Sequence, residues 1–176
     1  GERPKDVSGS VVISTVEGTR PMLLELQALV SPTSFGIPKR TATGVDYNRV
    51  SLLMAVLEKR VGMQIQNQDV YINVVGGMKV NEPSVDLGII MSIASSFRNI
   101  PIDEKLAITG EVGLTGEIRA VSFIEKRIAE CKKLGFTKMV IPKSNYDAIK
   151  DNIKGIEIYP VDSVRQAINI ILGGNR

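Results

Sequence analysis

The sequence predicts a mixed α/β domain of the α+β class, and three observations carry that prediction. The first third of the chain is rich in β-prone runs, and a nearly all-apolar helical run stands in the middle. The last third alternates short strands with short helices. With 176 residues, 43% of them hydrophobic, the chain is long enough for one globular domain with a real core.

The β-prone runs at 10–16 and 22–30 are joined by a plausible hairpin turn. Segment 31–46 holds two prolines and two glycines, and we expect a long loop there. An amphipathic helix with apolar residues at steps of three and four follows and ends at Gly62. Asp162 is the expected N-cap of the last helix. The other predicted elements are strands at 70–75, 105–109, 138–141 and 156–159 and helices at 84–97, 122–134, 145–152 and 162–172.

Composition excludes several classes of site. Cys131 is the only cysteine, so an internal disulfide is impossible and a reducing, cytoplasmic compartment fits. Histidine is absent, which excludes a Ser-His-Asp triad and ordinary structural zinc. No apolar run reaches the roughly 18 residues of a membrane span. The net charge of +3 permits binding to a polyanion without requiring it.

Two motifs carry the chemistry. Asn81-Glu82-Pro83-Ser84 opens the apolar helix, and a Thr-Gly-Glu segment at 109–118 precedes the next helix. Together they resemble the proteolytic domain of Lon proteases, in which a Pro-Ser pair carries the nucleophile and a later helix carries the catalytic lysine. The resemblance implies a ribosomal-S5-domain-2-like fold from about residue 10 to residue 176. It places Ser84 at the nucleophile position and, counting from Thr109, Glu125 at the lysine position.

A serine hydroxyl becomes a good nucleophile only when a neighbouring group accepts its proton. Glu125 is a weak base, and helical geometry turns Lys126 toward solvent. We therefore predict no catalytic residue, with Ser84 a vestigial nucleophile that caps or begins its helix. The alternative is an active Lon-type peptidase in which Lys79 or Lys126 activates Ser84.

Further motifs resemble the C-terminal domain of the bacterial RadA (Sms) family of DNA repair and recombination proteins. They lie at 17–21, 38–44, 74–77 and 110–119. The family implies an N-terminal zinc finger and a RecA-like ATPase that uses ATP and Mg²⁺, with residues 1–9 as the linker from that upstream part. No G-x-x-x-x-G-K-[ST] loop occurs in this chain, and we expect no cofactor or metal here.

The same resemblance implies a hexameric ring that works on single-stranded or branched DNA during recombination and branch migration, with RecA as a possible partner. Lys39, Arg40, Arg49 and Arg119 are the candidate DNA contacts, because cations on loops can reach phosphates. Each could equally be a solvated cation or an intersubunit partner. A third hypothesis is a platform that binds RecA or another protein without contacting DNA.

Overall fold

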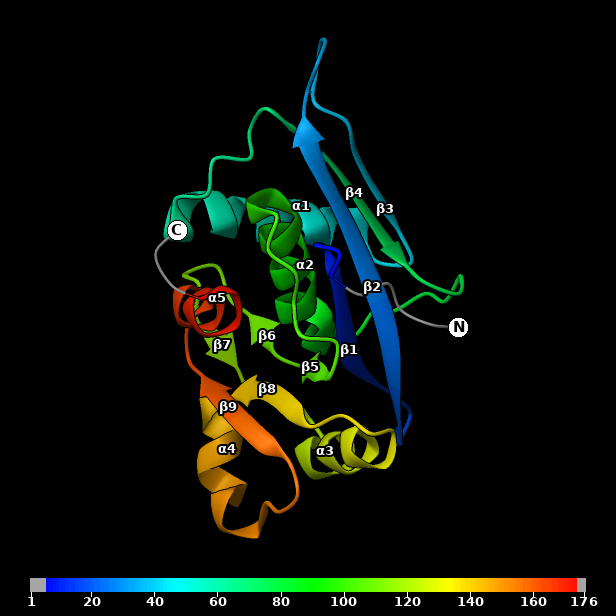
Figure 1. Ribbon diagram of the computed structural model, residues 1–176, viewed down its shortest axis with the longest axis vertical. Helices are drawn as coiled ribbons and strands as arrows, with labels where there is room; N and C mark the ends of the chain where they lie inside the picture. Colours follow the sequence, from blue (N-terminus) through cyan, green and yellow to red (C-terminus); the bar gives the residue numbers. More distant parts are fainter. Residues whose placement is uncertain (1–5, 174–176) are drawn as a thin grey trace.

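The computed structural model describes residues 6–173, and a mixed seven-stranded sheet organises them. The strand order is β3-β4-β2-β1-β5-β8-β9, and a separate two-stranded ribbon, β6-β7, lies at one side (Figure 1). β2 pairs antiparallel with β1 and β4, and the other neighbours in the large sheet pair parallel. The strands are β1 Ser10–Glu17, β2 Arg20–Pro32, β3 Arg40–Thr43, β4 Gln68–Val74, β5 Leu106–Ile108, β6 Glu111–Val112, β7 Ile118–Arg119, β8 Lys138–Pro142 and β9 Glu157–Val161.

Strand periodicity divides the core into two layers. Ile13 and Ile108 point into the larger apolar cluster under α1, α2 and α5, whereas their neighbours Val12 and Ala107 point into a smaller cluster under α3 and α4. The mixed α/β prediction is therefore confirmed. The helices are α1 Tyr47–Val56, α2 Asp86–Arg98, α3 Ile124–Lys133, α4 Lys143–Ile149 and α5 Val164–Leu172, with short turns η1 Leu57–Val61, η2 Pro83–Val85 and η3 Lys150–Asn152.

Helix α2 is the centre of the larger layer. Its residues from Asp86 to Ser95 are all buried, as the apolar run predicts. Gly88 allows this helix to approach β1 closely, because a Cβ at Gly88 would lie 2.2 Å from Cγ2 of Ile13. The helix ends at Asn99, which adopts the left-handed conformation (φ 58°) common after a helix C-terminus.

The expected loop at 31–46 is wrong in part. β2 continues to Pro32, and Arg40–Thr43 forms β3, a parallel edge strand on β4. The two prolines at 32 and 38 lie at the end of β2 and before β3, where a missing amide hydrogen does not interrupt the ladder. The two prolines therefore mark the ends of the loop, but they gave no indication of the short strand β3 that follows it.

Helix ends also differ from expectation. Ser163, not Asp162, caps α5, since the Ser163 hydroxyl accepts from the amide of Gln166. The first helix has the predicted end at Gly62, but its last turn, η1, widens into a π-helical turn before that glycine. Such turns often mark functional sites.

Residues 1–5 of the predicted linker lie outside the described residues. The rest of it packs on the domain, because the Gly9 amide donates to Ser95 Oγ and Ser8 Oγ donates to Asn99 Oδ1. Among residues 6–173, no helix is both long and apolar enough to cross a membrane.

We predict that Gly88→Ala destabilises the domain by about 1–3 kcal/mol, because the new methyl group overlaps a β-branched side chain that cannot swing away. Urea unfolding would measure the change. Ile13→Ala removes the clashing Cγ2 atom, so the two substitutions together should cost less than the sum of their separate costs. Strict additivity would contradict the proposed contact.

Candidate functional site

Ser84 lies in η2, the short turn that leads into α2, and only 3% of it is exposed. The chain around it is fixed by the backbone, because the Gly110 amide donates to Ser84 O and the Leu87 amide donates to Gly110 O. Of the two expected roles, Ser84 does stand in the first turn before α2, but it does not cap the helix. Neither η2 nor α2 has a side-chain cap, and Ser84 Oγ instead lies 3.4 Å from Ser14 O, to which it donates.

Arg127 of α3 donates hydrogen bonds to Ser84 and to the groups around it, although the Arg127 side chain is completely buried. One terminal nitrogen donates to Ser84 Oγ at 3.1 Å and to Ser14 O at 2.9 Å. Nε donates to Ser122 O at 2.7 Å, and the other terminal nitrogen forms an ion pair with Glu82. The guanidinium therefore joins β1, η2 and the start of α3.

The residue of α3 that meets Ser84 is thus Arg127, and the expectation of Glu125 at that position is wrong. Glu125 is exposed. Ile124, Ile128 and Cys131 form the buried stripe of α3, and Arg127 stands three residues after the first and four before the last. The helical period alone predicts that Arg127 lies on this stripe, although a charged residue is unusual on an apolar face.

Glu82 completes the arrangement on the other side. Its second oxygen accepts from Thr15 Oγ1 at 2.7 Å and from the Val16 amide at 2.6 Å. Burial opposes ionisation of Glu82, but the hydrogen bonds from Arg127, Val16 and Thr15 outweigh it, so its pKa lies below the usual value. The carboxylate is therefore charged at neutral pH and balances Arg127.

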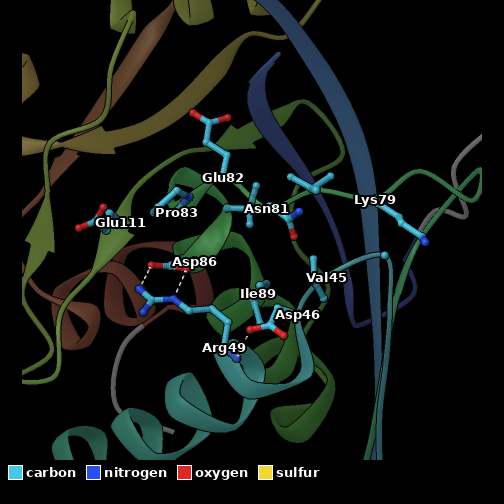
Figure 2. Close-up of a pocket in the computed structure, with 13 residues that line it drawn as sticks. Val45, Asp46, Arg49, Lys79, Asn81, Glu82, Pro83, Asp86, Ile89 and Glu111 are labelled. Atoms are coloured by element: carbon cyan, nitrogen blue, oxygen red, sulfur yellow. Dashed lines mark hydrogen bonds and ion pairs between the residues drawn. The ribbon is translucent and has the colours of Figure 1, made fainter. Parts of the chain in front are cut away.

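This geometry does not favour serine chemistry. A guanidinium stays protonated and has no lone pair for the Ser84 proton. Lys126 is exposed, 5.3 Å from the centre of the Phe123 ring and 3.4 Å from Thr19 O. Lys79 lines the neighbouring cleft, but Figure 2 shows its side chain pointing away from Asp86 and Arg49. Neither lysine has a contact with Ser84 among the interactions of the described residues.

A cleft of about 590 Å³ lies beside this joint, between the start of α1, the 79–83 segment and the start of α2. Its inner wall holds the fully buried carboxylate of Asp86, which Arg49 of α1 neutralises with two hydrogen bonds (Figure 2). Asp86 also accepts from the Val112 amide, and Arg49 donates to Val112 O. The bond to Asp86 is the main reason that the pKa of Arg49 is raised. Arg49 is therefore a structural cation of the cleft wall.

The other candidate DNA contacts do not lie together. Arg40 donates to the carbonyl oxygens of Ile65 and Gln66 and, through Nε, to that of Gln68, so it fixes the chain that enters β4. Arg119, on β7, pairs with Glu117, and bonds to Thr115 and Arg119 hold the pKa of that carboxyl at about 2. Lys39 is exposed at the start of β3. Figure 1 shows β3 and β7 on opposite sides of the domain.

Two further exposed arginines, Arg60 and Arg165, were missed by sequence reasoning, and they contact each other and the turn between β6 and β7. The Arg165 guanidinium donates to Arg60 O at 2.8 Å, and Arg60 Nε donates to Leu114 O at 3.3 Å. Gly116 permits this approach, because a Cβ there would lie 3.3 Å from Cβ of Arg60. Arg60, Arg119 and Arg165, here called the arginine surface, are exposed and come from η1, β7 and α5. Arg60 and Arg165 meet only in the folded chain, and Arg119 lies on the strand that follows the turn which Arg60 contacts.

No cluster of three or more His, Cys, Asp or Glu side chains able to hold a metal ion occurs in the described part of the chain. Cys131 is buried, and burial followed by the charge of Glu130 raises the pKa of its thiol to about 12. That thiol is therefore a poor ligand and a poor nucleophile.

Comparison with known proteins matches residues 47–174 to the family of the Lon protease (S16) C-terminal proteolytic domain. The chain belongs to this family. It is also similar to proteins named DNA repair protein RadA. One from Bacillus subtilis is 56% identical over 98% of the chain, one from Halalkalibacterium halodurans is 55% identical over 98%, and one from Listeria monocytogenes is 52% identical over 95%. The chain spans 38%, 37% and 36% of these relatives.

The sequence-based recognition is therefore confirmed at the level of the family and of the similarity to RadA proteins. Within this Lon-type domain, Ser84 stands in the turn before α2 and Arg127 stands near the start of α3, and both bond to the Ser14 carbonyl of β1. The matched range begins at α1 and so includes both residues.

We predict that Arg127→Met destabilises the domain by about 3–5 kcal/mol, because it leaves the Glu82 carboxylate without its charged partner. Glu82→Gln should cost a similar amount, because it keeps the bonds from Thr15 and Val16 but leaves the completely buried Arg127 guanidinium without its charged partner. The measurement is urea unfolding of both variants and of the double variant, which should lose less than the sum. A loss below about 1 kcal/mol for Arg127→Met would contradict the structural role.

The same pair gives a pH dependence. Because the pKa of Glu82 is lowered in the folded protein from 4.5, its contribution to stability is complete above that value and is lost as the pH falls through the folded pKa. Glu82→Gln should lack this part of the acid-side loss.

Proposed function

We propose that this Lon-type domain is a non-proteolytic scaffold of a DNA-repair protein, which assembles as a ring and contacts the DNA backbone. The buried Arg127 beside Ser84 carries the first part of the proposal. A permanently charged donor replaces a proton acceptor at the one serine that a Lon-type mechanism would use. The arrangement supports a structural joint in place of a nucleophile.

Burial supports the same conclusion. Ser84 is enclosed by the Ser14 carbonyl, Arg127 and the backbone of Gly110, so a peptide substrate has no approach to its hydroxyl. A peptidase that used Lys79 or Lys126 would need either lysine to displace Arg127 from its four partners.

The arginine surface supports contact with DNA. Arg60, Arg119 and Arg165 are exposed, and their bonds to carbonyl oxygens or to Glu117 leave several N–H donors for phosphate oxygens. Lys59 lies next to Arg60 in the same π-helical turn. A ring of copies would repeat this modest patch around one path, and repeated phosphate contacts add to affinity.

Similarity to RadA proteins supports the setting in DNA repair. In the proposed whole protein, an upstream ATPase uses ATP and Mg²⁺, a zinc finger precedes it, and RecA is a possible partner during processing of recombination intermediates. The domain described here would contribute the ring and the DNA-facing surface.

We predict no peptidase activity. Casein turnover should equal that of buffer, and a fluorophosphonate probe should not label Ser84, because no base is available to it. Arg127→Lys tests the idea more severely, since it supplies an amine at the correct place. Glu82 should keep that amine protonated. Turnover by the unchanged chain that Ser84→Ala abolishes would refute the proposal. Turnover gained by Arg127→Lys would refute only the expectation that Glu82 keeps the new amine protonated.

For DNA, we predict that Arg60→Ala with Arg165→Ala weakens binding without base preference. Each lost phosphate contact should flatten the slope of log affinity against log salt by roughly one unit. The matched control is Arg40→Ala. It removes one positive charge, as each of the two single variants does, but should instead cost about 2 kcal/mol of unfolding free energy, because the carbonyl of the buried Ile65 loses its donor.

The Arg60 and Arg165 double variant should therefore lose DNA affinity, whereas Arg40→Ala should lose stability. Normal DNA binding by the Arg60 and Arg165 double variant would remove the arginine surface from the proposal. If the double variant instead fails to assemble, these cations are intersubunit partners.

A further inference from the structure

Loop 33–38, between β2 and β3, carries two of the most exposed apolar side chains in the described part of the chain. Phe35 is 93% exposed and Ile37 is 87% exposed. Figure 1 shows this loop projecting beyond the end of the sheet. Such exposure of large apolar groups is costly in water unless a partner covers them. The loop is called the knob below.

The base of the knob is held by a set of hydrogen bonds. The Thr33 amide donates to Asn67 O, and Asp69 Oδ1 accepts from both Thr33 Oγ1 and the Lys39 amide. The bond from the Lys39 amide, followed by that from Thr33, holds the pKa of Asp69 below its usual range. A fixed base limits the entropy that the knob would lose on binding.

The same chain has an apolar recess of about 290 Å³ on the sheet face that α3 and α4 leave uncovered. Leu29, 60% exposed, and Tyr71 form its floor as paired residues of β2 and β4. Val7 closes one side, and Gln27 and Asn73 form a polar rim. An aromatic side chain with a small aliphatic neighbour fits a recess of this size and lining.

Charge is complementary between the two features. The knob is followed by two cations, Lys39 and Arg40, and no acidic residue occurs from 31 to 45. None of the residues that line the recess is charged. Three acidic residues stand beside it, since Asp6 precedes Val7, Glu25 bonds to the rim residue Gln27, and Asp69 lies two residues before Tyr71. Lys39 of the same chain bonds through its amide to Asp69 and offsets one of these charges. An acidic surround attracts a basic knob and repels another acidic one.

We infer that the knob of one copy docks into the recess of a second copy of this chain, with Phe35 and Ile37 against Leu29 and Tyr71. The inference rests on the self-association proposed above, to which it adds a specific contact. The knob cannot reach the recess of its own chain, because β2 continues as an extended strand from the recess to the base of the knob. We expect each knob to dock into the recess of a different copy, so that the contact is head-to-tail and can repeat until a ring closes, in place of a reciprocal exchange within one pair.

Engineered cysteines test the contact directly, because the native Cys131 is buried and its thiol has a pKa of about 12. A chain with Ile37→Cys is mixed with a size-tagged chain with Leu29→Cys and oxidised mildly. The mixed disulfide should form at least roughly tenfold faster than with Leu114→Cys. Leu114 is a matched control, 61% exposed but on the turn between β6 and β7. Equal rates overturn the contact.

Sedimentation separates this contact from assembly in general. Phe35→Ser with Ile37→Ser should raise the dissociation constant of self-association more than roughly tenfold, without changing unfolding, since both side chains are exposed. Leu114→Ser is the control and should change neither. Lys39→Glu should also weaken association, because it places a negative charge near the acidic surround.

The outcomes are distinct. A wild-type chain that associates normally, together with double variants that do so equally well, overturns the knob contact and leaves ring assembly standing. A wild-type chain that stays monomeric at every concentration overturns both. A cross-linked product that stops at a pair when both cysteines are in one chain overturns the head-to-tail order, and a ladder of larger products supports it.

Discussion

The guanidinium of Arg127 is the interaction on which the centre of the domain depends. A fully buried charge is tolerated only when it is paired and when its donors are satisfied. Arg127 meets both conditions by drawing Glu82, Ser84 and the Ser14 carbonyl to one point. The strand, the short turn and the helix that provide these groups are far apart in sequence, so one side chain sets their relative positions. The cost of burying it also explains why a single replacement there should affect the whole domain.

A second buried carboxylate repeats this principle at the cleft. Asp86 begins α2 and is neutralised by Arg49, whose guanidinium also binds Val112 O of the ribbon. At Ser84 and at the cleft, an arginine from another helix therefore pairs with the acidic side chain, Arg127 with Glu82 and Arg49 with Asp86. The polar groups around Ser84 and at the cleft wall are thus engaged in internal bonds, and the arginines of the arginine surface lie elsewhere, on η1, β7 and α5.

Much of this fold could be predicted from the sequence, because strands and helices with buried faces show their periodicity. The apolar run at 87–97 and the alternation after residue 122 are examples. β3 could not be predicted, since four residues beside prolines carry no period. For the site, the motif located Ser84, but counting along the motif chose Glu125 where the buried stripe of α3 contains Arg127. Arg60 and Arg165 of the arginine surface could not be found from the sequence, because they meet only through tertiary contacts.

The position of β1 has a consequence for how the chain folds. β1 lies in the middle of the sheet, paired with β2 next in sequence on one side and with β5 on the other, where Val12 faces Ala107. During synthesis, the hairpin of β1 and β2 can form early, but the opposite edge of β1 stays open until the ribosome has delivered β5. Pairings of such separation form slowly and leave an edge exposed to other chains in the meantime. A pause in synthesis between α2 and β5 would therefore have the largest effect on correct folding, because it would prolong the time for which this edge of β1 is exposed.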